Sequence, residues 1–135
     1  MKNLLLILLL LVSCTSFALN QQEQCEYNGI DYKVATKFIH DFKLALHKND
    51  RNSIANFASY PLRINTAPRK YYVIRNKKGL LAKYDSIFNA NAIKVILNDN
   101  AVFCNFQGGM LGPIWYKTDK HNAKFFVVNV QEMHI

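Results

Sequence analysis

The stretch "FCNFQGGMLGPIWYK", residues 103–117, places a pair of glycines between two segments that are rich in aromatic and apolar side chains. Glycine reaches the backbone angles that a tight reversal needs, so Gly108-Gly109 is predicted to form the turn of a β-hairpin. Gly112-Pro113 should break or bulge the second strand just before Trp115, the only tryptophan of the chain. This hairpin is the strongest indication of the fold.

The first strand of the hairpin should carry an apolar face. Side chains alternate along a strand, so Val102, Cys104 and Phe106 are predicted to point the same way. Cys104 would then lie among apolar neighbours. This favours a core residue or one half of a disulfide over a reactive thiolate.

Helices are predicted before this hairpin and a further strand after it. Apolar residues recur at three and four positions over residues 30–46, which predicts an amphipathic helix. A period of two over residues 123–133 completes an antiparallel meander. We therefore expect an α+β fold, with N-terminal helices packed on one face of a curved, mostly antiparallel sheet. The other predicted elements are a helix at 51–58 capped by Asp50 or Asn52, strands at 62–65 and 71–75, a helix at 77–89 capped by Asn76, and a short helical segment at 92–97.

The first 18 residues follow the plan of a secretory signal peptide. Lys2 precedes an unbroken apolar run at residues 4–12, and small and polar residues follow the run. The run has nine residues, whereas a helix needs about 20 apolar residues to cross a bilayer. We therefore expect an exported protein rather than a membrane-spanning one.

Two cleavage sites compete in this segment. The small residues of "SFA", 16–18, suit a general signal peptidase, which would cut after Ala18. The sequence "LVSC", 11–14, resembles a bacterial lipobox, in which Cys14 would be lipidated. Both starts are similar to that of a Gram-negative envelope protein, so we expect a periplasmic protein, soluble or anchored by its N-terminus. A polar leader at 19–29 would then precede a single domain at 30–135.

Two cysteines remain whichever site is cut. Cys25 and Cys104 form an even pair in an oxidising compartment, which favours a disulfide between them. Closing a loop of about 80 residues would stabilise the fold by roughly 4 kcal/mol in the chain-entropy model. Two buried free thiols, or a nucleophilic Cys104, are the alternatives.

The charge of the chain indicates anionic partners. The 17 lysine and arginine residues outnumber nine acidic residues, a formal charge of +8, and removal of residues 1–18 takes away Lys2 alone. An exported basic protein should favour phospholipid head groups, lipopolysaccharide phosphates or an acidic partner protein. Nucleic acid is not expected, because the compartment excludes most of it.

The densest basic stretch is "RKYYVIRNKK", residues 69–78. On a strand its cations and aromatic rings would interleave and could hold an anionic or glycan-like ligand by charge and stacking. The other interpretation is that this is an edge strand, whose charged side chains prevent it from pairing with another chain. The candidate ligand-binding residues are Arg69, Lys70, Tyr71, Arg75, Lys77 and Trp115.

The chain resembles the nuclear-transport-factor-2-like (NTF2-like) superfamily, in particular its small exported bacterial members of unknown role. The segments that carry the resemblance are "FIHDFKLALHKNDRNSIANFASYPLRIN", "YDSIFN" and "FCNFQGGMLGPIWYK", and it extends over about residues 30–132. The resemblance implies a long helix in the mouth of a strongly bent sheet, which forms a cone with a pocket or a filled core. Because the superfamily includes enzymes and plain binding domains, the resemblance implies no particular function, and no catalytic motif carries over.

Catalytic and metal chemistry find little support in the sequence. His40 and His47 lie about 10.5 Å apart along a helix, too far to share a zinc ion that is bound at about 2.1 Å. An isomerase-type pocket would need a carboxylate base and a tyrosine or protonated acid. The residue types are present, but no spacing selects them, so we assign no catalytic residue, metal ligand or cofactor. The carboxylate and phenol groups considered are Asp41, Asp85, Asp99, Tyr32, Tyr60 and Tyr84.

Two hypotheses for the function follow. The first is a non-catalytic envelope module that holds a partner protein or an anionic envelope component by a basic face or the mouth of the cone, as inhibitor or immunity proteins do. The second is a small-molecule enzyme, similar to an isomerase or dehydratase, with its pocket inside the cone. The identity of the partner, and whether the protein forms a homodimer, stay open.

The two cleavage sites predict different products. Cleavage before Cys14 leaves an acylated chain in the membrane fraction, and cleavage after Ala18 leaves a chain that starts at Leu19. Intact-mass measurement of each fraction distinguishes the two products. Cys14→Ala should remove the protein from the membrane fraction if the chain is acylated, and should leave its distribution unchanged if the cut follows Ala18. A mass that retains residues 1–13 would contradict export with processing.

Overall fold

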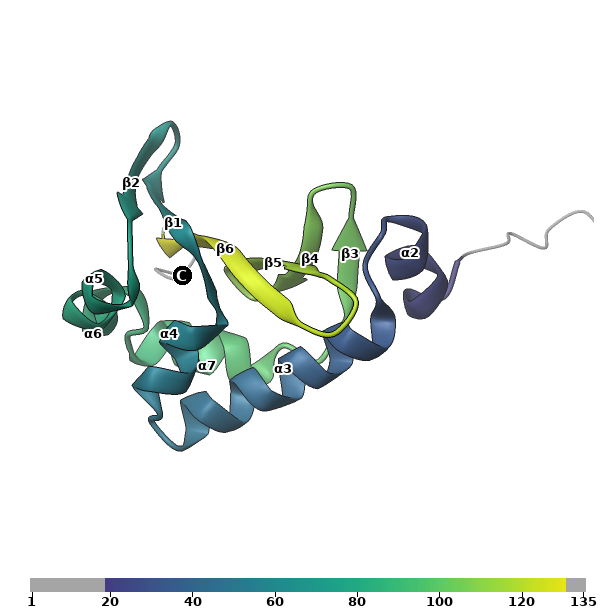
Figure 1. Ribbon diagram of the computed structural model, residues 1–135, viewed down its shortest axis with the longest axis horizontal. Helices are drawn as coiled ribbons and strands as arrows, with labels where there is room; N and C mark the ends of the chain where they lie inside the picture. The colour runs from purple at the N-terminus through teal and green to yellow at the C-terminus, as the bar shows by residue number, and fades with distance from the viewer. Residues whose placement is uncertain (1–18, 131–135) are drawn as a thin grey trace, which may run out of the picture.

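The computed structural model describes residues 19–130, which form an α+β structure with one bent sheet and helices packed against it (Figure 1). Helices α3 (Tyr32–His47), α4 (Arg51–Phe57) and α7 (Ala90–Asn98) form a layer along one side of the sheet. The predicted signal peptide, both cleavage sites, Cys14 and the last five residues of the predicted domain lie outside the described residues. The expected α+β class is confirmed.

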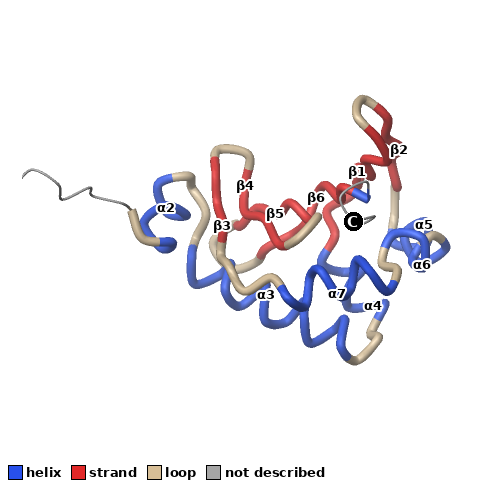
Figure 2. Tube along the Cα trace, turned by 180° about the vertical axis from the view of Figure 1, so that it is seen from behind, coloured by secondary structure: helices blue, strands red, loops and turns tan. Residues whose placement is uncertain are grey.

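The sheet has six strands in the order β2-β1-β6-β5-β4-β3. Neighbouring strands are antiparallel except β1 and β6, which run parallel. Figure 2 shows the resulting arrangement, with two hairpins, β1–β2 and β3–β4, projecting from the same side of the sheet, away from α3. The strands are β1 (Ala58–Ala67), β2 (Lys70–Ile74), β3 (Phe103–Asn105), β4 (Gly108–Leu111), β5 (Ile114–Thr118) and β6 (Ala123–Asn129).

Polar side chains begin five of the helices. Each of these N-cap residues accepts a hydrogen bond from the backbone N–H three residues later, and so satisfies a donor that the first turn leaves without a partner. Asp50 and Asn76 were predicted for this role and fill it. The caps are Asn20, Asp31, Asp50, Asn76 and Asn89.

Aromatic rings fill the space between α3 and the sheet. Phe42 on α3 lies 5.5 Å from Phe125 on β6 and 6.2 Å from Phe88, between ring centroids. Phe38, one turn earlier, lies 4.8 Å from the ring of Tyr116 on β5. All five rings are buried, so the predicted amphipathic stripe of the first long helix forms the centre of the core.

The glycine pair has another role than the one predicted. The reversal is made by Phe106-Gln107, while Gly108-Gly109 begins β4. Gly109 pairs with Tyr116, and a Cβ atom at residue 109 would lie 2.2 Å from Cζ of that ring. Glycine is therefore required because the tyrosine ring lies over its backbone.

Several predicted boundaries were wrong. Phe106 is in the turn with 85% of its surface exposed, rather than on the Cys104 face. The break predicted at Gly112-Pro113 is confirmed, but it separates two paired strands, so the predicted three-stranded meander has four strands. The helix expected at 77–89 is divided at Lys83 into α5 (Lys77–Ala82) and α6 (Tyr84–Ile87), and the segment expected at 92–97 belongs to the nine-residue helix α7.

The polar leader that we expected to precede the domain is part of the fold. Residues Gln21–Tyr27 form helix α2, in which Cys25 is fully buried. Cys25 and Cys104 form the predicted disulfide, with their Cα atoms 4.9 Å apart. The bond fastens α2 to the edge strand β3 and closes a separation of 79 residues.

Loss of this bond should destabilise the protein. Because the loop is long, we expect the Cys25→Ser/Cys104→Ser protein to lose about 4 kcal/mol of unfolding free energy, measured by urea denaturation. Reductant should lower the stability of the wild type to the same value and leave the double variant unchanged. Equal stability of the oxidised and fully reduced wild type would contradict this role.

Candidate functional site: the outer face of the sheet

One row of paired residues crosses all six strands on the face away from α3. Direct pairing joins Phe103 to Met110, Met110 to Trp115 and Trp115 to Val127. The row continues from Val127 to Arg63 and from Arg63 to Val73. Directly paired residues share a face of the sheet, so these side chains form one continuous line. We call this set the outer row: Val73, Arg63, Val127, Trp115, Met110 and Phe103.

The outer row is more apolar than an exposed sheet face normally is. A sheet with helices on one side usually turns polar side chains to the other side. Here five of six positions are apolar, with Phe103 41% and Val73 44% exposed at the two ends. The neighbouring row on the inner face, from Cys104 through Tyr116 to Phe125, is buried as expected. An apolar stripe on the solvent side is typical of a surface that contacts something else.

A hollow of about 460 Å³ lies over this row, and its lining residues come from β1, β5, β6 and the β3–β4 turn. Gln107 reaches it from the turn, opposite Arg63 on β1. Phe126 enters it because the pairing of β5 with β6 shifts by one residue there and leaves Phe126 unpaired as a bulge. Its lining residues are Arg63, Asn65, Gln107, Trp115, Phe126, Val127 and Asn129.

Arg63 is held in place from two sides. Its Nε donates to Oδ1 of Asn65 at 2.7 Å, and Nδ2 of Asn65 donates to Oδ1 of Asn129 at 2.7 Å. Its guanidinium also lies 4.1 Å from the centroid of the Tyr71 ring. These contacts fix the orientation of the guanidinium at the edge of the hollow, so little side-chain entropy remains to be lost on binding.

The charged side chains of the strands have one sign. The six described strands contain Arg63, Lys70, Lys117 and Lys124 but no aspartate or glutamate. Seven basic residues and no acidic ones lie between residues 63 and 83. A ligand on the outer face would therefore meet apolar side chains and positive charge.

The structure brings together only part of the predicted site. Tyr71 and Trp115 lie on the outer face, and Tyr71 contacts Arg63 there. Arg69 and Lys70 lie at the exposed tip of the β1–β2 hairpin. The two remaining predicted residues lie at the far end of β2 and do not line the hollow, since Arg75 follows that strand and Lys77 begins α5.

Sequence reasoning missed the residues that complete the site. Arg63 and Asn65 stand in the predicted strand 62–65, but their alternation gave no reason to place them beside Trp115. That neighbourhood depends on the parallel pairing of β1 with β6. Phe126 was missed because a bulge cannot be read from a period of two.

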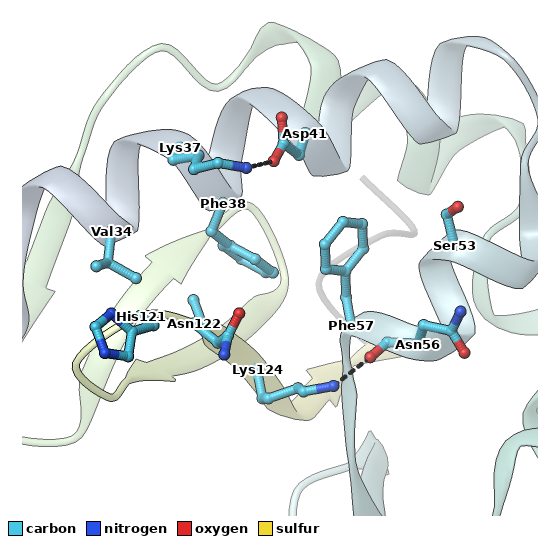
Figure 3. Close-up of a pocket in the computed structure, with 11 residues that line it drawn as sticks. Val34, Lys37, Phe38, Asp41, Ser53, Asn56, Phe57, His121, Asn122 and Lys124 are labelled. Carbon is cyan, nitrogen blue, oxygen red and sulfur yellow. Dashed lines mark hydrogen bonds and ion pairs between the residues drawn. The ribbon is translucent and has the colours of Figure 1, made fainter.

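A second, smaller hollow of about 230 Å³ lies among α3, α4 and the β5–β6 turn (Figure 3). Phe38 and Phe57 lie in its apolar part, with ring centroids 5.6 Å apart. The charged groups around it have protein partners, since Lys37 pairs with Asp41 and Lys124 donates to the Asn56 carbonyl. It therefore offers a ligand fewer unengaged charges than the outer face does.

The three carboxylates considered for catalysis are engaged elsewhere. Asp41 and Asp85 pair with Lys37 and Arg51 on the surface, and Asp99 accepts backbone N–H bonds from Gly112 and Ala101. The phenols of Tyr84 and Tyr116 are buried without a hydrogen-bond partner. Within residues 19–130 no group of three or more histidine, cysteine or acidic residues could hold a metal ion.

Burial sets the ionisation of Tyr116. Desolvation, helped by the nearby Asp99 carboxylate, raises the pKa of the Tyr116 phenol well above its usual value of about 10. The hydroxyl therefore stays protonated within the core. It cannot act as an acid or base near neutral pH.

Comparison of the chain with protein-family models, with curated proteins and with solved structures found no match. In the described part of the chain, no helix has the length and apolarity needed to cross a membrane. The function must therefore be argued from the outer face itself.

The buried phenol gives a prediction with a matched control. Tyr116→Phe removes a buried hydroxyl that has no partner and should stabilise the fold by about 1 kcal/mol. Tyr60→Phe removes the bond from the Tyr60 hydroxyl to the Ala55 carbonyl, 2.8 Å, and should cost about 1 kcal/mol. Urea denaturation measures both. A loss of stability in Tyr116→Phe would show that its hydroxyl has a partner.

The same variants predict a pH dependence. The folded pKa of Tyr116 is raised, so its contribution to stability is complete below about pH 10 and is lost above it, where only the unfolded state releases the proton. The alkaline decline in unfolding free energy should be shallower in Tyr116→Phe than in the wild type. Equal slopes would contradict the raised pKa.

Proposed function

We propose that this protein is an exported, non-catalytic binding module of the bacterial cell envelope, which holds an anionic partner on the outer face of its sheet. The observation that carries the proposal is the outer row. Five apolar side chains and one fixed arginine stand where an exposed sheet face normally carries polar residues.

Charge and shape support the same conclusion. The strands carry cations without acidic residues, so an anionic partner meets no repulsion. The hollow of about 460 Å³ is within the usual size of ligand sites and combines Trp115 and Phe126 with polar groups. The partner class is an envelope protein with acidic residues or an anionic envelope component, and inhibitor or immunity-type proteins fall within it.

The proposed setting rests on the N-terminal sequence. Residues 1–18 direct export, and lipidation at Cys14 would tether the domain to a membrane while its basic face stays accessible. The NTF2-like superfamily remains our proposal for the fold family. Its support is the long first helix packed against a strongly bent sheet, in the order that the resemblance implies.

The alternative, an enzyme with a pocket inside the cone, has less support. The rings of Phe38, Phe42, Phe125 and Tyr116 occupy the space between α3 and the sheet where a substrate would bind. A catalytic pair of a carboxylate and a phenol would also need a bond between them. The buried phenols of Tyr84 and Tyr116 have no such bond.

Site-specific photocrosslinking in cells that express the full chain tests the proposal. A photoreactive residue at Met110, in the apolar part of the outer row, should give an adduct of one defined mass. The same residue at Asn91, an exposed position on α7 in the helical layer, should not. Arg63→Glu should abolish the Met110 adduct, since it reverses the only charge of the row.

The adduct is identified by its mass, as a protein or as an envelope component. Equal crosslinking from Met110 and Asn91 would overturn the proposal. So would a Met110 adduct that persists in Arg63→Glu when circular dichroism shows that the variant is folded.

A further inference from the structure

The outer row has its one charged residue, Arg63, near one end and a longer apolar part on the other side of it. From Arg63, the direction across β6, β5, β4 and β3 meets four apolar side chains in succession. They are Val127, Trp115, Met110 and Phe103. In the opposite direction the row ends one strand further on, at Val73, and Tyr71 and the basic tip of the β1–β2 hairpin lie beside Arg63 and Val73. The surface thus has the same polarity as a molecule with a charged head and a hydrocarbon tail.

The apolar part also has a defined length. Neighbouring strands are about 4.8 Å apart, so the line from Val127 to Phe103 measures about 14 Å. Half of a bilayer's hydrocarbon core, the depth of one acyl chain, is about 15 Å. One extended chain therefore matches the apolar part of the row from end to end.

The side chains along this line suit a flexible hydrocarbon. Methionine at 110 adapts its shape to irregular apolar partners. Trp115 and Phe126 offer flat apolar faces at the hollow, where the chain would begin. Apolar contact of this kind is not directional, so chain length rather than chain structure would decide affinity.

Arg63 is suited to bind the charged head of such a molecule. A guanidinium forms two parallel hydrogen bonds with a carboxylate, and this guanidinium is already oriented by Asn65 and Tyr71. The strands offer no acidic side chain that would compete for it. The ammonium groups of Lys70 and Lys117 add favourable charge at longer range.

We propose that the outer row binds a single-chain anionic amphiphile, specifically a free fatty acid, with the carboxylate at Arg63 and the chain lying across β6, β5, β4 and β3. This inference rests on the proposed function, because it names the anionic partner of the same face. The hollow favours a single molecule over a bilayer surface, because the β3–β4 turn at Gln107 and the β1 strand at Arg63 both border it. A flat bilayer could not contact the residues between them.

The single tryptophan makes the test direct. Trp115 fluorescence of the purified protein, expressed from the full chain, is titrated with monomeric tetradecanoate at low ionic strength. We expect a saturable change with one ligand per protein. Tetradecanol, which has the same tail and no charge, should bind at least about tenfold more weakly, because the charge-assisted bond is lost.

Variants locate the head and the tail. Arg63→Met should weaken tetradecanoate binding about tenfold while leaving tetradecanol unchanged. Lys94→Met removes an exposed basic residue of α7 in the helical layer that does not line the hollow, so it should have little effect. Met110→Asp should weaken both ligands because it places a charge in the path of the chain. Circular dichroism and thermal unfolding confirm that each variant is folded.

Several outcomes would overturn the inference. Equal affinity for tetradecanoate and tetradecanol, or an unchanged tetradecanoate affinity in Arg63→Met, would show that the carboxylate does not bind at Arg63. Binding only to phosphatidylglycerol vesicles would identify a membrane surface instead. If Trp115 fluorescence changes with protein concentration in the absence of ligand, and sedimentation shows a dimer, the occupant of the outer row is a second copy of the chain.

The inference and the proposed function can fail separately. If tetradecanoate does not bind but crosslinking from Met110 yields an Arg63-dependent protein adduct, the fatty acid is wrong and the binding module stands. If tetradecanoate does not bind and Met110 yields no specific adduct, both are wrong.

Discussion

The parallel pairing of β1 with β6 is the contact on which the rest of the structure depends. It joins residues 58–65, which follow the helices, to residues 125–129 at the end of the described chain. Without it the molecule would hold a two-stranded hairpin and a four-stranded meander, each with open edges. With it, one sheet has an inner face that the aromatic core covers and an outer face on which Arg63 lies beside Val127, which in turn lies beside Trp115.

Packing on the inner face of the sheet restricts which residues can stand at a few positions. Tyr116 requires glycine at 109, because the ring occupies the space of a side chain there. The aromatic rings of α3 then pack on Tyr116 and Phe125, and the Cys25–Cys104 disulfide fixes α2 to the edge strand β3. A core filled in this way holds the sheet in one bend.

The outer face carries the features that stability alone does not require. The apolar side chains at the two ends of the outer row, Val73 and Phe103, are exposed to water and gain little from burial. Arg63 is held by Asn65 and Tyr71 rather than by an acidic partner. A surface that is apolar, positively charged and oriented before a ligand arrives loses little entropy on binding. These properties favour recognition of an anionic molecule with a hydrocarbon or other apolar part.

The sequence by itself determined the α+β fold class, the first long helix, the helix caps at Asp50 and Asn76, and the disulfide. All of these depend on local periodicity, on local hydrogen bonding or on a count of two cysteines. It also selected Tyr71 and Trp115. Only the tertiary structure decided which residues form the candidate site, because strand pairing between distant segments sets which residues share a row, and a one-residue bulge brings Phe126 to the hollow. Neither leaves a local pattern in the chain.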